Sequence, residues 1–133
     1  MKPLVVLLLL AMASGGRTAS PTPVSGRYSI AALRQLAASL GFADPNTAAA
    51  IAMAESGGNP QATNIVTSPA PGNLPERSFG LWQINTLGNP QFNEAQLLDP
   101  TYNARAALSL SRGGTDFRAW STFNSGLYKR YMP

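Results

Sequence analysis

Three segments of the chain carry helix start and stop signals at both ends. Asp-Pro pairs open the segments 44–58 and 99–114, Ser29 opens the segment 29–41, and each segment ends in glycine. A capping side chain, proline in the first turn and glycine after the last turn commonly bound a helix. No alternating apolar run is long enough for a large sheet. The sequence therefore predicts a mainly α fold, a compact helical domain with at most a small hairpin.

The N-terminal region differs in composition from the rest of the chain. The full length of 133 residues is enough for one small domain. Residues 1–19 have a charged start, an apolar centre and an Ala-x-Ala pattern, as in a secretory signal peptide. The apolar run is shorter than the roughly 20 residues of a membrane span. We expect a signal peptide or short N-terminal hydrophobic segment at 1–19, a linker at 20–28, a domain at 29–133, and export to the periplasm or extracellular space.

The composition excludes several kinds of chemistry. The chain has no cysteine and no histidine, which excludes disulfides, Cys-His and Ser-His catalytic pairs, and the usual zinc sites. Its net charge of +4 favours an anionic surface such as a cell-envelope polymer. The arginines are scattered along the chain, so we do not expect nucleic-acid binding. Carboxylates, hydroxyl groups and lysines remain as candidate catalytic groups.

Glu55 is the carboxylate that the predicted helices place most unusually. It falls near the C-terminal end of the segment 44–58, facing the negative end of the helix dipole, a misfit of about 0.3–1 kcal/mol. At helical spacing it shares a face with Ala48, Ile51 and Ala52. Both effects disfavour the ionised form, so we expect a raised pKa and a candidate general acid. The alternative is a solvated glutamate at a helix end.

A loop and a short apolar and amide segment follow Glu55. Four prolines and a glycine in residues 59–77 predict a long irregular loop. The segment 78–85 suits a short strand or turn that lines a cleft. Gln83 and Asn85 would bind sugar hydroxyl or acetamido groups, and Trp82 would offer an apolar wall, although Trp82 suits a core position equally well.

Taken together, four motifs resemble those of a known superfamily. They are Ala54-Glu55-Ser56-Gly57-Gly58-Asn59-Pro60, Ser78-Phe79-Gly80-Leu81-Trp82-Gln83-Ile84-Asn85, the Asp99-Pro100-Thr101-Tyr102-Asn103 helix start, and Phe123-Asn124-Ser125-Gly126. In this order and spacing they resemble the lysozyme-like superfamily, in its soluble lytic transglycosylase and goose-type lysozyme branch, including the small versions of bacteriophages. The resemblance covers residues 30–131.

The resemblance implies an α+β lysozyme-like fold with a substrate cleft and no metal or cofactor. It implies cleavage of peptidoglycan at the β-1,4 bond between N-acetylmuramic acid (MurNAc) and N-acetylglucosamine (GlcNAc), with Glu55 as general acid and base. A lytic transglycosylase giving a 1,6-anhydro product is favoured over a hydrolytic muramidase. The expected substrate-binding residues are Ser56, Ser78, Gly80, Leu81, Trp82, Gln83, Asn85, Phe123 and Asn124.

Two features of the sequence bear on the choice between transglycosylase and hydrolase: a departure from the family's tyrosine motif and a candidate partner carboxylate. Phe123 stands where the family usually has tyrosine, so a positioning hydroxyl is missing, which weakens the transglycosylase assignment. Glu76 is the best candidate for a second catalytic carboxylate, which hydrolysis would require. Asp44 and Asp99 are interpreted as helix caps.

The remaining expectations concern the other acidic residues, the partners and the location. Glu94 and Asp116 are interpreted as exposed loop residues. A monomer that binds peptidoglycan glycan strands is expected, or, as an alternative, a non-catalytic lysozyme-fold protein that binds cell wall or forms part of a virion. A phage-encoded version would be virion-associated.

Overall fold

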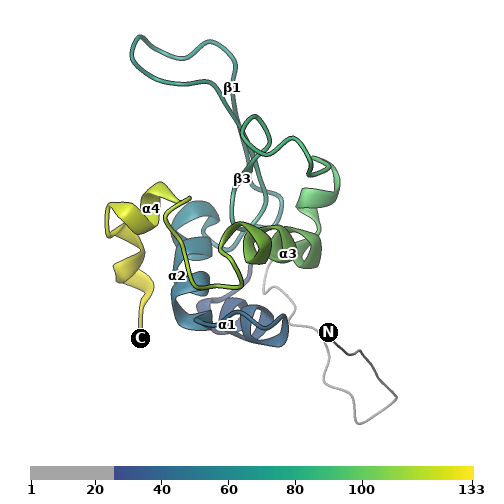
Figure 1. The fold of residues 1–133 in the computed structure, drawn as a ribbon, viewed down its shortest axis with the longest axis vertical. Helices are drawn as coiled ribbons and strands as arrows, with labels where there is room; N and C mark the ends of the chain where they lie inside the picture. Colours follow the sequence, from purple (N-terminus) through teal and green to yellow (C-terminus); the bar gives the residue numbers. More distant parts are fainter. Residues whose placement is uncertain (1–25) are drawn as a thin grey trace.

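The computed structural model describes residues 26–133, so the predicted signal peptide and most of the predicted linker lie outside the described residues. Four α-helices, three short strands and two 3-10 helices follow one another in this part of the chain (Figure 1). Their order is α1 (Ile30–Ser39), α2 (Pro45–Ser56), β1 (Thr63–Val66), β2 (Glu76–Phe79), β3 (Ile84–Asn85), η2 (Gln96–Leu98), α3 (Pro100–Leu110), α4 (Ser121–Asn124) and η3 (Leu127–Tyr131). The predicted mainly α fold with a small hairpin is confirmed. Within residues 26–133, no helix has the length and apolar character needed to cross a membrane.

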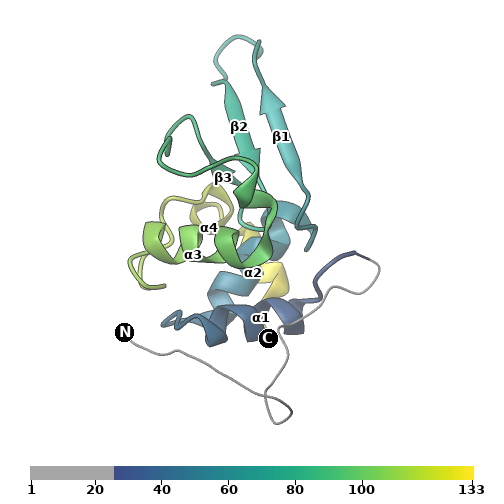
Figure 2. The ribbon, with the colours of Figure 1, turned by 90° about the vertical axis from the view of Figure 1, so that its right-hand side faces the viewer.

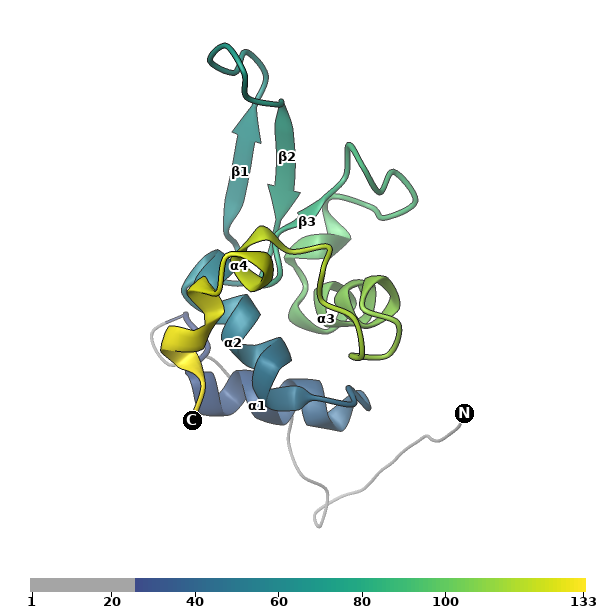
Figure 3. The same cartoon turned by 60° about the vertical axis from the view of Figure 1, so that its left-hand side comes forward.

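Helix α2 lies at the centre of the helical body. Its residues 47–52 are buried, and α1, α4 and η3 pack against it (Figure 3). The Asp44 side chain accepts a 3.0 Å hydrogen bond from the Thr47 backbone N–H, and Gly57 ends the helix in the left-handed conformation, with φ of 63°. The predicted bounds of this helix are confirmed, and Glu55 lies in its last turn.

The other two long helices also begin at the predicted caps. The Ser29 hydroxyl accepts a hydrogen bond from Ala32 at the start of α1, and the Asp99 carboxylate accepts one from Tyr102 at the start of α3. Tyr28 is buried, and its backbone N–H donates to the Gly58 carbonyl at 2.7 Å. Tyr28, at the end of the expected linker, therefore packs against the domain.

The three strands form one antiparallel sheet in the order β1-β2-β3. In the β1–β2 hairpin Ile65 pairs with Arg77, and this hairpin projects from the helical body (Figure 2). The prediction of an irregular loop over residues 59–77 was therefore wrong at 63–66 and 76–77. Pro69, Pro71 and Pro75 all lie in the connection between the strands, where no ladder hydrogen bond is lost.

A buried asparagine of α3 fixes the turn between β2 and β3. The Asn103 side chain donates to the Phe79 carbonyl at 2.8 Å and to the Leu97 carbonyl at 2.9 Å. Its Oδ1 accepts a 2.9 Å hydrogen bond from the Trp82 backbone N–H. Gly80 lies against this amide, and a Cβ there would come within 2.2 Å of the Asn103 nitrogen. The segment that follows Gly80 is thus held in one position against α3.

Candidate active site

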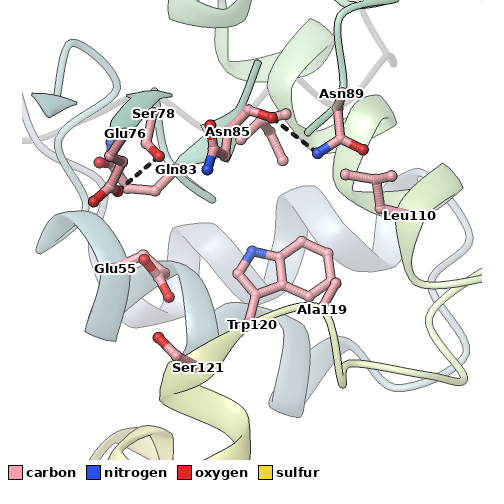
Figure 4. Close-up of a pocket in the computed structure, with 11 residues that line it drawn as sticks. Glu55, Glu76, Ser78, Gln83, Asn85, Asn89, Leu110, Ala119, Trp120 and Ser121 are labelled. Atoms are coloured by element: carbon pink, nitrogen blue, oxygen red, sulfur yellow. Dashed lines mark hydrogen bonds between the residues drawn. The ribbon is translucent and has the colours of Figure 1, made fainter. Parts of the chain in front are cut away.

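A cleft of about 210 Å³ opens between the sheet, the last turn of α2 and the segment that leads into α4 (Figure 4). Carboxylate and amide side chains from α2, β2 and β3 line one part of it, and apolar side chains line another. The lining residues are Glu55, Glu76, Ser78, Gln83, Ile84, Asn85, Asn89, Leu110, Ala119, Trp120 and Ser121. The cleft therefore combines acidic groups and amides with apolar side chains, among them Trp120, which is only 5% exposed.

Glu55 is partly buried in this cleft, at the end of α2. Burial raises the pKa of Glu55 above its usual 4.5, since the ionised carboxylate loses hydration. A 2.8 Å hydrogen bond from the Thr122 hydroxyl to Oε2 opposes this effect, and the charge of Glu76 adds to it. The predicted upward shift of the pKa is confirmed, with desolvation as its main cause.

Glu76 lines the same cleft from β2. Glu76 and Ser78 are two residues apart on this strand, so their side chains point to the same face. The Ser78 hydroxyl, which is buried, donates a 2.8 Å hydrogen bond to Glu76 Oε2. In Figure 4 Glu76 and Glu55 both lie at the end of the cleft away from Asn89 and Leu110. The structure thus brings the predicted second carboxylate into the cleft with the first.

Amide groups form the next part of the wall. The Gln83 backbone is in the left-handed region, with φ of 47°, which is unusual for a residue with a side chain. Its Nε2 donates to the carbonyls of Ala62 and Gly80, each at 3.0 Å, so Oε1 is the atom that can accept from a ligand. Asn85 also lines the cleft, and its carbonyl accepts a 2.9 Å hydrogen bond from the Asn89 amide. Gln83 and Asn85 are where the sequence predicted them.

The apolar part of the cleft was missed by the sequence analysis. Ile84, Leu110, Ala119 and Trp120 form it. The Trp120 indole N–H donates a 2.8 Å hydrogen bond to the Trp82 carbonyl, which fixes the ring against the β2–β3 turn. The only signal in the sequence is that Trp120 and Ser121 lie shortly before the Phe123-Asn124 motif, from which Thr122 separates them.

The prediction that Leu81 and Trp82 line the cleft was wrong. Both side chains are fully buried. The Trp82 ring stacks on Phe42 with ring centroids 5.9 Å apart, and its indole N–H donates to the Ala48 carbonyl at 3.0 Å. Inside the core the apolar ring is therefore packed against another ring, and its polar N–H has a hydrogen-bond acceptor. The core interpretation of Trp82 is the correct one.

Ser56 and Gly80 also lie outside the cleft, in structural positions. The Ser56 hydroxyl donates to the Ala52 carbonyl at 2.9 Å and accepts from the Gly58 backbone N–H at 3.2 Å, which closes the end of α2. Gly80 is buried against Asn103. Both residues shape the backbone near Glu55 and offer no side chain to a ligand.

Phe123 and Asn124 are likewise absent from the cleft wall. The Phe123 ring packs between Phe117 and Tyr128, with ring centroids 5.9 and 5.0 Å apart. The Asn124 amide donates to the Arg118 carbonyl at 2.9 Å. These two predicted substrate-binding residues instead stabilise the C-terminal segment that carries α4.

Glu94 and Asp116 were predicted to be exposed loop residues, and both form ion pairs. Arg77 contacts Glu94 through two hydrogen bonds of 2.7 and 2.8 Å, and Arg118 pairs with Asp116 at 2.8 Å. Hydrogen bonds from Arg77 and from the Thr86 hydroxyl lower the pKa of Glu94 to about 2. Neither acid lines the cleft. The described residues contain no cluster of three or more acidic side chains that could hold a metal ion.

Comparison with known proteins adds one finding to this geometry. A family model described as "Lysozyme like domain" matches residues 34–122, from α1 into α4. No match was found among curated proteins or among solved structures. The matched range contains all the residues that line the cleft.

Proposed function

Because the chain belongs to the lysozyme-like domain family, we propose that it cleaves the β-1,4 bond between MurNAc and GlcNAc in peptidoglycan. Proteins of this family generally act on peptidoglycan as glycosidases or transglycosylases. The observation that carries the proposal is Glu55, a partly buried acid with a raised pKa in a cleft that also holds Glu76. Glycosidic cleavage needs such an acid beside a developing positive charge.

Glu55 acts first as general acid. Its protonated carboxyl group donates the proton to the glycosidic oxygen, the bond from this oxygen to the MurNAc C1 breaks, and the leaving GlcNAc departs as an alcohol. Positive charge then develops on the sugar ring that remains. The Glu76 carboxylate, which accepts a hydrogen bond from Ser78, stabilises this charge from the same cleft.

The position of Glu76 supports hydrolysis as the outcome. In this reaction Glu76 takes a proton from a water molecule while the water oxygen forms a bond to C1, and the product is a reducing sugar. Two acidic groups in one cleft, one with a raised pKa, suit the separate roles of acid and base. A carboxylate that pointed to solvent would favour a mechanism with one glutamate instead.

Transglycosylation is the second candidate, and the order of the sequence motifs favours it. In this reaction the ionised Glu55 takes the proton of the MurNAc C6 hydroxyl, whose oxygen attacks C1 and closes a 1,6-anhydro ring. No water is consumed, so the product is lighter than the hydrolytic product by one water. Glu76 would then act through its charge alone.

Product analysis tests both candidates. Purified protein is incubated with sacculi, and the released fragments are examined by mass spectrometry for reducing or 1,6-anhydro ends. Glu55→Gln should release no fragments. Glu94→Gln, the same change outside the cleft, should retain activity. A fully active Glu55→Gln variant contradicts the proposal, and binding to sacculi without release of fragments by the wild type indicates a non-catalytic wall-binding or virion protein.

We also propose that the protein is exported, or virion-associated if phage-encoded. The proposed substrate lies outside the cytoplasmic membrane, and residues 1–19 have the composition of a secretory signal. Mass spectrometry of the protein recovered from the periplasm or medium tests this proposal. An intact N-terminus on a cytoplasmic protein would contradict it.

A further inference from the structure

A hydroxyl group from the C-terminal part of the chain contacts Glu55. Thr122 Oγ1 donates a 2.8 Å hydrogen bond to Glu55 Oε2, although the two residues are 67 positions apart in the sequence. Within residues 26–133, no other side chain makes a hydrogen bond to this carboxyl group. The contact joins α4 to the last turn of α2.

This hydrogen bond distinguishes the two oxygens of the carboxyl group. Oε2 accepts from Thr122, and within residues 26–133 Oε1 takes part in no hydrogen bond, so we expect the proton of the acid form on Oε1. A glutamate at a helix end has several rotamers, and a fixed donor selects one of them. The hydrogen bond from Thr122 therefore limits the orientations open to the Glu55 carboxyl group.

The segment that carries Thr122 is fixed by contacts of the aromatic residues on either side of it. Trp120 anchors the start of α4 through its hydrogen bond to the Trp82 carbonyl, and it accepts a backbone hydrogen bond from Phe123. The Phe123 ring packs between Phe117 and Tyr128. Thr122 thus lies between two anchored aromatic residues, which suits a group that must hold another in place.

We propose that Thr122 is the positioning residue of Glu55, holding Oε2 so that the protonated Oε1 points into the cleft. The inference rests on the proposed function of Glu55 as the acid. Thr122 then affects the turnover rate and its pH dependence through Glu55, without touching the substrate.

The groups around Glu55 define the expected pH effect. Thr122 stabilises the ionised carboxylate, and Glu76 on β2 disfavours it. In the described part of the chain, the charged residues of the other elements that pack on α2 are Arg34 of α1 and Lys129 and Arg130 of η3, and none of them shifts the pKa of Glu55. Loss of the Thr122 hydroxyl therefore raises the pKa of Glu55 further.

The test compares three variants of the full chain. Thr122→Val removes the hydroxyl at nearly constant volume, Thr122→Ser keeps a hydroxyl, and Thr115→Val makes the same change at an exposed site. For Thr122→Val we expect kcat on sacculi to fall about tenfold with little change in KM. The alkaline limb of its pH profile should move to higher pH. Thr122→Ser should restore both properties, and Thr115→Val should match the wild type.

A second measurement separates this inference from the proposed function. Titration of the Glu55 carboxyl carbon by NMR reports its pKa whether or not the protein is an enzyme. A wild type that releases no fragments overturns the proposed function, while a higher Glu55 pKa in Thr122→Val still supports the contact. Unchanged titration and pH profile in Thr122→Val overturn the inference, even if kcat falls. Thr122→Ala replaces Thr122→Val if thermal unfolding shows that the valine variant is not folded.

Discussion

Glu76 on β2 raises the pKa of Glu55 on α2 through its negative charge, across the cleft that both residues line. Glu76→Gln should therefore lower the pKa of Glu55 and move the alkaline limb of the pH profile to lower pH. If Glu76 is the base, kcat should also fall about 10²- to 10⁴-fold. Initial rates of fragment release between pH 4 and 9 measure both effects. A variant with the wild-type rate and profile would show that Glu76 has no catalytic part.

The raised pKa of Glu55 also makes stability depend on pH. The folded state holds this proton more tightly than the unfolded state, so its contribution is complete below pH 4.5 and is lost as pH rises through the folded pKa. At neutral pH, Glu55→Gln should therefore unfold at a higher temperature than the wild type, and at pH 4 the two should be similar. Calorimetry at the two pH values measures this difference. A lower unfolding temperature of the variant at neutral pH would contradict the burial argument.

Glu94 should show the opposite dependence. Its pKa of about 2 lies below the usual 4.5, so the stability that it contributes is present above pH 4.5 and is lost as pH falls towards 2. Glu94→Gln should reduce the loss of stability over this range. The effect is small and decreases in high salt, since the Arg77–Glu94 pair is partly exposed. Urea unfolding at pH 2.5 and 5, with and without added salt, tests the prediction.

Asn103 should matter more for stability than any exposed amide. Asn103→Leu leaves the buried carbonyls of Phe79 and Leu97 and the N–H of Trp82 without their partner. Each such group costs about 1–3 kcal/mol, so we expect a loss of about 3 kcal/mol or more in the free energy of unfolding. Asn46→Leu, at an exposed site of α2, serves as control and should change stability by less than about 0.5 kcal/mol. Equal stability of the two variants would contradict this assignment.

The helices were predictable because their signals are local. Ser29, Asp44 and Asp99 cap the backbone three residues further on, and these contacts depend on nothing outside each helix. The raised pKa of Glu55 was predictable for a related reason, since helical spacing alone placed it beside buried alanines. The β1–β2 hairpin was missed because pairing between residues 63–66 and 76–79 depends on contacts across a proline-rich connection.

The side chains that line the cleft were only partly predictable. A motif indicates which residues are neighbours in the chain, but the direction of each side chain depends on contacts with distant segments. Trp82 is buried because its ring stacks on Phe42 and its indole N–H donates to the Ala48 carbonyl. Neither contact has a signal near Trp82 in the sequence. Trp120 lines the cleft and contacts the Trp82 carbonyl, 38 positions away. Thr122 contacts Glu55, 67 positions away.

The last wall of the cleft comes from residues 119–121, close to the C-terminal end of the sequence. Glu55 and its hydroxyl donor Thr122 are 67 positions apart, so a chain that ends before Ala119 lacks both this wall and the donor. The cleft around Glu55 is therefore complete only when the segment that leads into α4 has packed against α2 and the sheet.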